Sequence, residues 1–350
     1  MAEGNHSTVS EFVLLGLCDS CELQIFFFIF ILVLYLVIVL SNTFIVILVI
    51  TDSHLHSPMY FLLSNLSFVD LWLSSVTTPK MITDLLKENK TISFGGCMCQ
   101  ILFVHFAGGC EMTLLVTMAY DRYVAICKPL HYTNIMSQRR CIWLVMISWT
   151  IGFVHSMSEF AVIVQLPFCG PSVVNSFFCD IPLVIELACI DTYSLGIWMN
   201  YDSGSLAMTC FIILLISYTY ILFTVCHYSK DGASKALSTC TAHIMVVVLF
   251  FGPCIFIYVW PLNITSLDKF LAVFYLVITP LLNPAIYTFR NKEMKISLRR
   301  FVSTFRDFIP LAMSGAGLIH LNPGSSHPHL LGLHRIISTT TGKQQTIIPV

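Results

Sequence analysis

Long runs of apolar residues, separated by short polar segments, dominate the pattern along this chain of 350 residues. A helix that crosses a bilayer needs about 20 consecutive, predominantly apolar residues. Seven runs meet this requirement, at about residues 25–50, 58–79, 98–121, 141–166, 196–223, 238–261 and 270–289. The pattern predicts an all-α membrane protein, a seven-transmembrane helix bundle over residues 25–289.

The segments outside the bundle differ from it in composition. Residues 1–24 form a short arm before the first run, and residues 290–306 predict a short amphipathic helix after the seventh span. The tail, residues 307–350, contains "GAGLIHLNPGSSHPHLLG" and "STTTGKQQ" and is too interrupted for another span. Its composition is typical of disordered polypeptide, and it predicts no function.

Composition and charge support a membrane protein and set its orientation. The chain is 56% hydrophobic and 11% charged, more apolar than a soluble domain can hide. Its net charge of -1 argues against a nucleic-acid partner. With the N-terminus outside, only Lys80, Lys87, Lys90 and Lys269 face outward, and the other 14 of the 18 Lys and Arg residues face the cytoplasm. This distribution follows the positive-inside rule.

The outer segments carry candidate modification sites. Asn5 begins the sequon Asn5-His6-Ser7 on the extracellular arm, where an N-linked glycan is expected. The long outer loop at residues 167–195 holds three of the 14 cysteines, and Cys97 lies at the outer end of the third span. Because the outer surface is oxidising, these four cysteines predict two disulfides, whose connectivity the spacing leaves open.

Two acidic residues fall in the middle of predicted spans. Asp70 lies in the second span and Glu111 in the third, where an ionisable side chain is costly and marks a functional site by default. If the two helix faces meet, the carboxylates would share a proton or hold a small cation. A neutral hydrogen-bonded pair that only fixes helix packing explains them equally well.

Catalytic and metal-binding patterns are missing from the sequence. We find no ligand cluster of the HExxH kind and no pair of nucleophile and base. The sequence therefore predicts neither an enzyme nor a cofactor, and no metal site.

Asp121 and Arg122 end the third span on the cytoplasmic side. Adjacent opposite charges at this depth are explained by ordinary snorkelling at a helix end. The alternative is a latch, in which Asp121 holds Arg122 in one state and releases it in another.

The stretch "MAYDRYVAICKPLHY", residues 118–132, resembles the hallmark of the olfactory receptors, a branch of the rhodopsin-like G-protein-coupled receptors. Four further blocks agree in order: "LHSPMYFLLSNLSFVDL" from 55, "SY" at 217, "KALSTCTAHI" from 235 and "PLLNPAIYTFRNKEMK" from 280. "FFCDIPLVIELACIDTY" and "DKFLAVFY" are most similar to class II receptors of family 4. The resemblance covers about residues 5–305.

This resemblance implies an odorant receptor, a multi-pass protein of the plasma membrane in the cilia of olfactory sensory neurons. It would bind a small volatile odorant and activate a heterotrimeric G protein of the olfactory, stimulatory type, which raises cyclic AMP. It also implies disulfides between Cys97 and Cys179 and between Cys169 and Cys189.

The resemblance also implies roles for residues inside the bundle. Asp70 and Glu111 match the family's ion or water site. The activation residues implied by the motifs are Asp121, Arg122, Tyr123, Tyr218 and Tyr287.

The ligand pocket is implied for the outer half of the bundle, at positions counted from the same motifs. Its predicted residues are Val104, His105, Gly108 and Gly109 on the third helix, Asp202, Ser203 and Leu206 on the fifth, and Phe251, Cys254 and Tyr258 on the sixth. Such a cavity suits an uncharged ligand with one oxygen or nitrogen function. Asp202 adds a preference for an amine or a metal-assisted thiol, although core polarity or a loop contact explains it equally well. A satisfied core histidine likewise explains His105.

Two departures from the family pattern and two alternatives remain. The chain continues to Val350, beyond the usual end near Lys295, and the sixth helix carries Phe250, Phe251 and Gly252 where many relatives have a tyrosine. A transporter or channel would use Asp70 and Glu111 as a proton relay, but the sequence has no internal repeat. The same receptor architecture could also sense a metabolite outside the nose.

Overall fold

The structure is a computed structural model that describes residues 9–18, 20–169, 172–228, 233–258, 265–290, 293–301 and 303. Asn5 and the tail at 307–350 lie outside the described residues, so the predictions for them stay predictions. The chain divides into two units, residues 1–297 and 298–350. The bundle belongs to the first unit, and the described residues of the second, 298–301 and 303, are helical.

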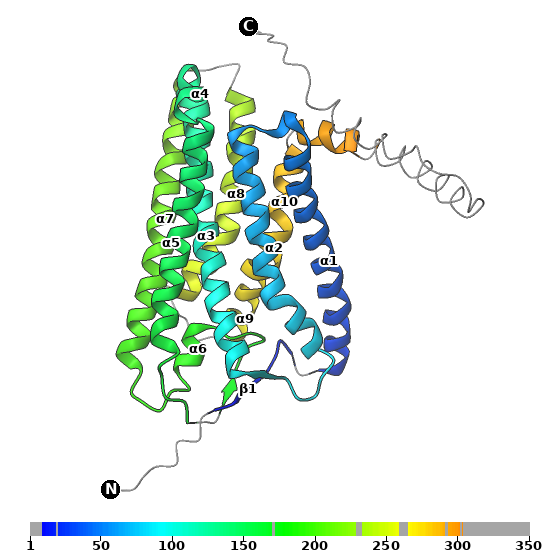
Figure 1. Cartoon of the computed structure of the whole chain (residues 1–350), viewed down its shortest axis with the longest axis vertical. Coiled ribbons are helices and arrows are strands. Elements are labelled where there is room, and N and C mark those ends of the chain that lie inside the picture. Colours follow the sequence, from blue (N-terminus) through cyan, green and yellow to red (C-terminus); the bar gives the residue numbers. More distant parts are fainter. Residues whose placement is uncertain are drawn as a thin grey trace, which may run out of the picture. The chain divides into compact units, whose positions relative to one another are not determined.

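Long helices run side by side through the first unit (Figure 1). They are α1 (Cys21–Thr51), α2 (Pro58–Asp84), α3 (Phe94–Cys127), α5 (Gln138–Ile163), α7 (Tyr193–Tyr228) and α8 (Ala233–Tyr258). The last span is continuous but has three parts: α9 (Thr265–Val273), the π-helical segment η3 (Phe274–Ile278) and α10 (Thr279–Arg290). Among the described residues, six spans are long and apolar enough to cross a membrane, and α8 adds the shorter apolar segment His243–Tyr258. The predicted seven-helix, all-α membrane bundle is confirmed.

The helices differ in how much of their surface they bury. α1 exposes large apolar side chains along its length, among them Phe26, Ile29, Val33 and Leu40. Apolar residues all round a helix are expected where lipid is the solvent. By contrast, α3 contacts α2, α5, α7 and α8, and most of its residues are buried. It is the central helix of the bundle, and the residues that it positions belong to the protein interior.

Helix α3 extends beyond the predicted span. The apolar run stops at Asp121, but the helix continues to Cys127 because residues 122–127 contain no helix breaker. Pro129 then cannot continue it and opens the short helix η2 (Pro129–His131), which is followed by α4 (Tyr132–Ile135). Asp121 and Arg122 therefore lie within a helix and not at its end.

A small sheet adds to the all-α bundle at the outer end. Strand β1 (Glu11–Leu14) pairs antiparallel with β2 (Thr91–Ser93) and parallel with β3 (Val173–Val174). Alternate residues of β1, Phe12 and Leu14, are fully buried against the outer loops, which explains why this part of the N-terminal arm is ordered as a strand.

Two disulfides hold the long outer loop in place. Cys97 at the start of α3 is joined to Cys179, and Cys169 is joined to Cys189, which is the connectivity that the family resemblance implies. Between them lies the short helix α6 (Ile181–Ile185), whose N-cap is Asp180. The loop is therefore fixed on the outer end of α3, and Asp180 is brought into the bundle.

Candidate functional site

An inner cavity of 40 Å³ lies in the outer half of the bundle. It is lined by Leu73, Val104, His105, Gly108, Gly109, Met112, His155, Ser203, Phe250, Cys254, Tyr258 and Tyr275. Seven of the ten predicted ligand residues are among them. The α3 residues recur at helical spacing on one face, which is why this helix presents them together.

Three of the predicted ligand residues do not line this cavity. Asp202 and Leu206 border a groove of 500 Å³ on the surface between α5 and α7. Positions 202, 205, 206 and 209 share one helical stripe, whereas Ser203 lies about 100° further round and faces inward. Phe251 is completely buried and packs against Phe211 at 5.9 Å between ring centroids. In this conformation its place at the cavity is taken by Phe250.

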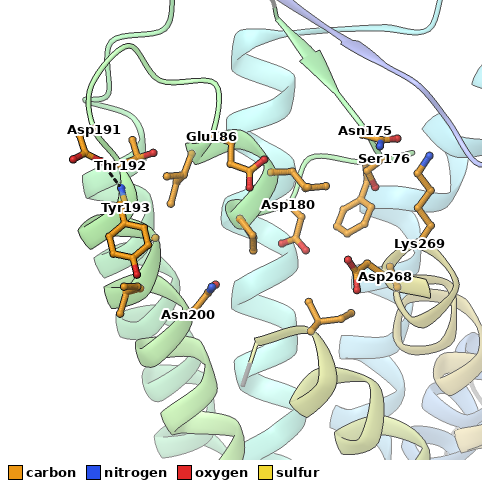
Figure 2. Close-up of a pocket in the computed structure, with 18 residues that line it drawn as sticks. Asn175, Ser176, Asp180, Glu186, Asp191, Thr192, Tyr193, Asn200, Asp268 and Lys269 are labelled. Carbon is orange, nitrogen blue, oxygen red and sulfur yellow. Dashed lines mark hydrogen bonds between the residues drawn. The ribbon is translucent and has the colours of Figure 1, made fainter. Parts of the chain in front are cut away.

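A larger outer pocket of 520 Å³ lies between the outer loop and the ends of α7, α8 and α9 (Figure 2). Its wall carries four carboxylates, Asp180, Glu186, Asp191 and Asp268, and the ammonium group of Lys269. Sequence reasoning did not predict this pocket, because it forms only when the loop between the two disulfides folds over the bundle.

Asp180 connects the outer pocket with the inner cavity. Its carboxylate accepts a hydrogen bond from the Tyr258 hydroxyl at 3.2 Å, and Nε2 of His105 lies 3.5 Å from Oδ1. Both partners line the inner cavity, whereas Asp180 lines the outer pocket. These three side chains therefore connect the walls of the two spaces.

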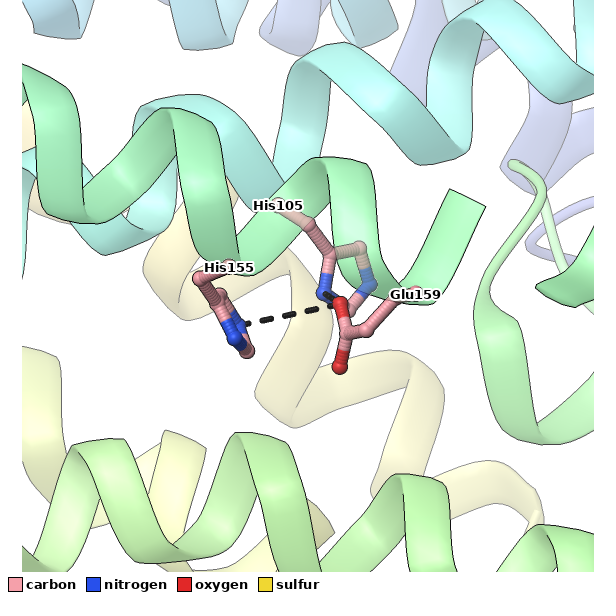
Figure 3. Close-up of side chains that lie close together, drawn as sticks. All are labelled: His105, His155 and Glu159. Carbon is pink, nitrogen blue, oxygen red and sulfur yellow. Dashed lines mark ion pairs between the residues drawn. The ribbon is translucent and has the colours of Figure 1, made fainter. Parts of the chain in front are cut away.

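Ionisable side chains of α5, His155 and Glu159, lie beside His105 (Figure 3). Nδ1 of His105 lies 2.8 Å from Oε2 of Glu159, and Nε2 of His155 lies 3.7 Å from the same oxygen. Glu159 also accepts a hydrogen bond from Ser203. Nδ1 of His155 is 3.2 Å from Asp202, so the polar groups of α3, α5 and α7 form one connected network.

Sequence reasoning missed His155, Glu159 and Asp180. The first two lie in the predicted fourth span, where any ionisable residue signals a functional site, so the signal was present. Asp180 gave no such signal, because its loop was expected to lie outside the bundle.

Asp70 and Glu111 meet in the centre of the bundle. The side-chain amide of Asn283 donates to both carboxylates, at 3.0 Å from Asp70 Oδ2 and 3.3 Å from Glu111 Oε1. All three side chains are at most 1% exposed. Two carboxylates around one amide can share a proton or hold a small cation, since both cannot remain charged without a counter-ion. Asn283 belongs to the "PLLNPAIY" block and was not predicted as a site residue.

The cytoplasmic part of α3 carries a hydrogen-bonded charge pair. Arg122 donates to Asp121 Oδ2 from Nη2 at 2.7 Å and from Nε at 3.1 Å, and the Tyr132 hydroxyl donates to Oδ1 at 2.8 Å. Asp121 is fully buried. Burial and the adjacent Asp121 carboxylate raise the pKa of the Tyr132 hydroxyl, so it remains a donor at physiological pH.

The other predicted activation residues lie near this pair or outside the described side chains. Tyr123 packs edge-on against Tyr220, with 5.4 Å between ring centroids, and Lys128 lies 5.8 Å from its ring. Tyr218 is buried, and its ring is 6.5 Å from that of His243. The side chain of Tyr287 lies outside the described part of the chain.

A seven-helix membrane bundle with a cavity in its outer half and a charged pair near its cytoplasmic end is the architecture of a G-protein-coupled receptor. The family described as "Olfactory receptor" matches residues 30–304. The chain belongs to this family. Its members are multi-pass receptors of the plasma membrane and not enzymes, which confirms those predictions.

Similar curated proteins agree with this assignment. Human olfactory receptor 4K3 is 59% identical over 303 residues, which cover 87% of this chain and 96% of that protein. Human olfactory receptor 4K14 is 62% identical over 85% of this chain and 96% of its own length. Human olfactory receptor 4F4 is 61% identical over 83% of this chain and 96% of its own. The predicted resemblance to family 4 is confirmed.

Proposed function

We propose that this receptor binds a small volatile odorant in the inner cavity and activates a stimulatory G protein of the olfactory type, which raises cyclic AMP. The cilia of olfactory sensory neurons are the proposed location. The observation that carries the proposal is the convergence of seven predicted ligand residues, from three helices, on one cavity. This convergence favours a binding site over a set of unrelated core residues.

The sizes of the two spaces suggest a route for the ligand. Ligand sites are usually about 300–1,000 Å³ in volume, so the outer pocket of 520 Å³ can receive an odorant, whereas the inner cavity of 40 Å³ must first expand. Separation of Tyr258 from Asp180 would open the way and free the Tyr258 hydroxyl for the ligand. The remaining wall is mostly apolar, which suits a molecule with one oxygen or nitrogen function.

Helix α3 offers a path from the cavity to the cytoplasmic side. Met112 lines the cavity and is adjacent to Glu111 of the central carboxylate pair. Asp121 lies ten residues after Glu111, about 15 Å further along the helix axis. A shift of α3 would therefore change the contacts of Met112, Glu111 and Asp121 together. We propose that this shift releases Arg122 to the G protein.

The test is a cyclic AMP reporter assay with a panel of odorants in cells that lack the stimulatory Gα subunits. No odorant should give a signal until the olfactory-type or the related stimulatory Gα subunit is supplied. An odorant response seen only as a fall in cyclic AMP with an inhibitory subunit, or only as a calcium signal with a Gq-type subunit, would contradict the proposed coupling. A ligand-independent current would instead support the transporter or channel alternative.

We expect His105→Ala and Tyr258→Phe to change agonist potency more than surface expression. Loss of a buried hydrogen bond of about 0.5–1.5 kcal/mol corresponds to a rightward shift of roughly 2- to 12-fold for Tyr258→Phe, and His105→Ala should shift potency further because it removes a whole side chain. The measurement is the concentration-response curve, normalised to surface receptor. Tyr201→Phe, at a tyrosine that is 73% exposed, is the matched control. Unchanged curves for both cavity variants would refute the assignment of this cavity.

A further inference from the structure

The two histidines and the glutamate of Figure 3 lie close enough together to hold a metal ion. His105, His155 and Glu159 each offer one ligand atom, and the three atoms lie within 4.8 Å of one another. A tetrahedral zinc ion with bonds of about 2.0–2.2 Å would place its ligand atoms about 3.4 Å apart. The distances from Glu159 Oε2 to Nδ1 of His105, 2.8 Å, and to Nε2 of His155, 3.7 Å, bracket that value.

Each of these three side chains has a polar group near its other polar atom, and for Glu159 the contact is a hydrogen bond. Nδ1 of His155 lies 3.2 Å from Asp202, Nε2 of His105 lies 3.5 Å from Asp180, and Glu159 accepts a hydrogen bond from Ser203. Metal-bound histidines almost always have a carboxylate or carbonyl on the second ring nitrogen, because it fixes the tautomer and the ring orientation. Asp180 and Asp202 are therefore placed where they could become the outer partners of metal-bound histidines.

The negative charge of the cluster requires either protonated histidines or a bound cation. Within the described residues, the ion pairs of Glu159, Asp180 and Asp202 are all with the two histidines. Two neutral imidazoles would leave three carboxylates uncompensated, whereas two protonated imidazoles, or a divalent cation bound by neutral imidazoles, would leave one. Such an excess is costly in a membrane-spanning bundle.

The hydrogen bonding at the shared carboxylate oxygen favours the bound cation. Oε2 of Glu159 is fully buried and makes no hydrogen bond of acceptable geometry within the described part of the chain, although a ring nitrogen is 2.8 Å away. A buried carboxylate oxygen without such a bond is expensive. A metal ion between this oxygen and the ring nitrogens would satisfy all three atoms.

We propose that His105, His155 and Glu159 bind a divalent transition-metal ion of the zinc or copper class. Two imidazoles and one carboxylate suit these ions and not the hard cations magnesium and calcium, which prefer oxygen ligands. Both histidines line the inner cavity, so the fourth position of the ion faces water or a ligand there. The site lies in the wall of the proposed odorant cavity, but metal binding is measured directly and does not depend on the odorant proposal.

The first test is zinc binding to the full-length receptor, purified in lipid nanodiscs, by competition with a chelating dye. We expect one tightly bound ion per receptor, and an affinity about 100-fold lower for His105→Gln or Glu159→Gln. Asp202→Asn should lower it about 10- to 100-fold through His155. His131→Gln, at an exposed histidine on the cytoplasmic side, is the matched control and should bind as the wild type does. Equal affinities in all variants would overturn the proposal.

The second test identifies the ligand atoms and remains informative if a variant folds poorly. X-ray absorption of the zinc-loaded receptor should report imidazole nitrogen and carboxylate oxygen at about 2.0–2.2 Å. Scattering dominated by sulfur would assign the ion to cysteines and refute the site. His155→Cys keeps a ligand and should shift the preference from zinc towards the softer cadmium ion by about tenfold or more. An unchanged preference in this variant would also overturn the proposal.

Discussion

Arg122→Ala is expected to abolish the odorant-stimulated cyclic AMP signal while receptor remains at the cell surface. The Arg122 guanidinium donates two hydrogen bonds to Asp121, and in the proposed active state the same group is released to the G protein. Alanine removes the group from both states. The measurement is the maximal agonist response at matched surface expression. Arg140→Ala is the control, because Arg140 is exposed and donates to the Ile135 carbonyl.

The neighbouring substitution should have the opposite effect. Asp121→Asn keeps the shape of the side chain but removes the charge that holds Arg122, so basal cyclic AMP should rise several-fold without agonist. Hydrogen bonds to a charged group contribute about 1.5–3 kcal/mol, enough to shift a two-state equilibrium about 10-fold or more. Tyr132→Phe removes one neutral donor to Asp121 and should raise the basal signal less. If Asp121→Asn stayed silent and Arg122→Ala still signalled, ordinary snorkelling would be the better explanation of this pair.

The seven-helix bundle could be predicted from the sequence because each membrane span depends only on the residues within it. Each span needs only a run of apolar residues long enough for the bilayer, and this property is visible without knowledge of any neighbour. The end of α3 was less predictable. Hydrophobicity stops at Asp121, whereas the helix stops only near Pro129, because backbone hydrogen bonding and not lipid contact sets its length.

The site was predicted in part, since its contacts depend on how the helices rotate and pack. Asp70 and Glu111 are conspicuous as acids in apolar runs, but their shared partner Asn283 is 213 residues away from Asp70 in the sequence. On α7 Ser203 lines the inner cavity, whereas Asp202, one residue or about 100° away, faces His155. Rotation of this size is set by packing against α5 and α3, which the periodicity of one helix does not determine.

Helices α3 and α5 pack so closely that an added methyl group at their contact should strongly destabilise the receptor. The two helices meet at Gly109 and Gly152, and a Cβ atom added to Gly109 would lie 3.0 Å from the Gly152 Cα. At Gly152 an added Cβ would lie 2.6 Å from Cys110 Sγ, 2.8 Å from the Cys110 nitrogen and 2.9 Å from the Phe106 carbonyl oxygen. Backbone atoms cannot rotate away as a side chain can, so the helices would have to separate.

Gly152→Ala is therefore expected to destabilise the receptor by about 1–3 kcal/mol or more, the usual range for overpacking, and to remove most of it from the cell surface. Separation of the helices would also move His155 and Glu159 away from His105, so receptor that does reach the surface should respond weakly. The measurements are surface expression and the thermal unfolding midpoint of purified receptor. Gly252→Ala on α8 is the matched control, because its added Cβ meets nothing within 4 Å and alanine is the better helix former. Equal expression and equal unfolding midpoints for the two variants would mean that α3 and α5 do not need this close contact.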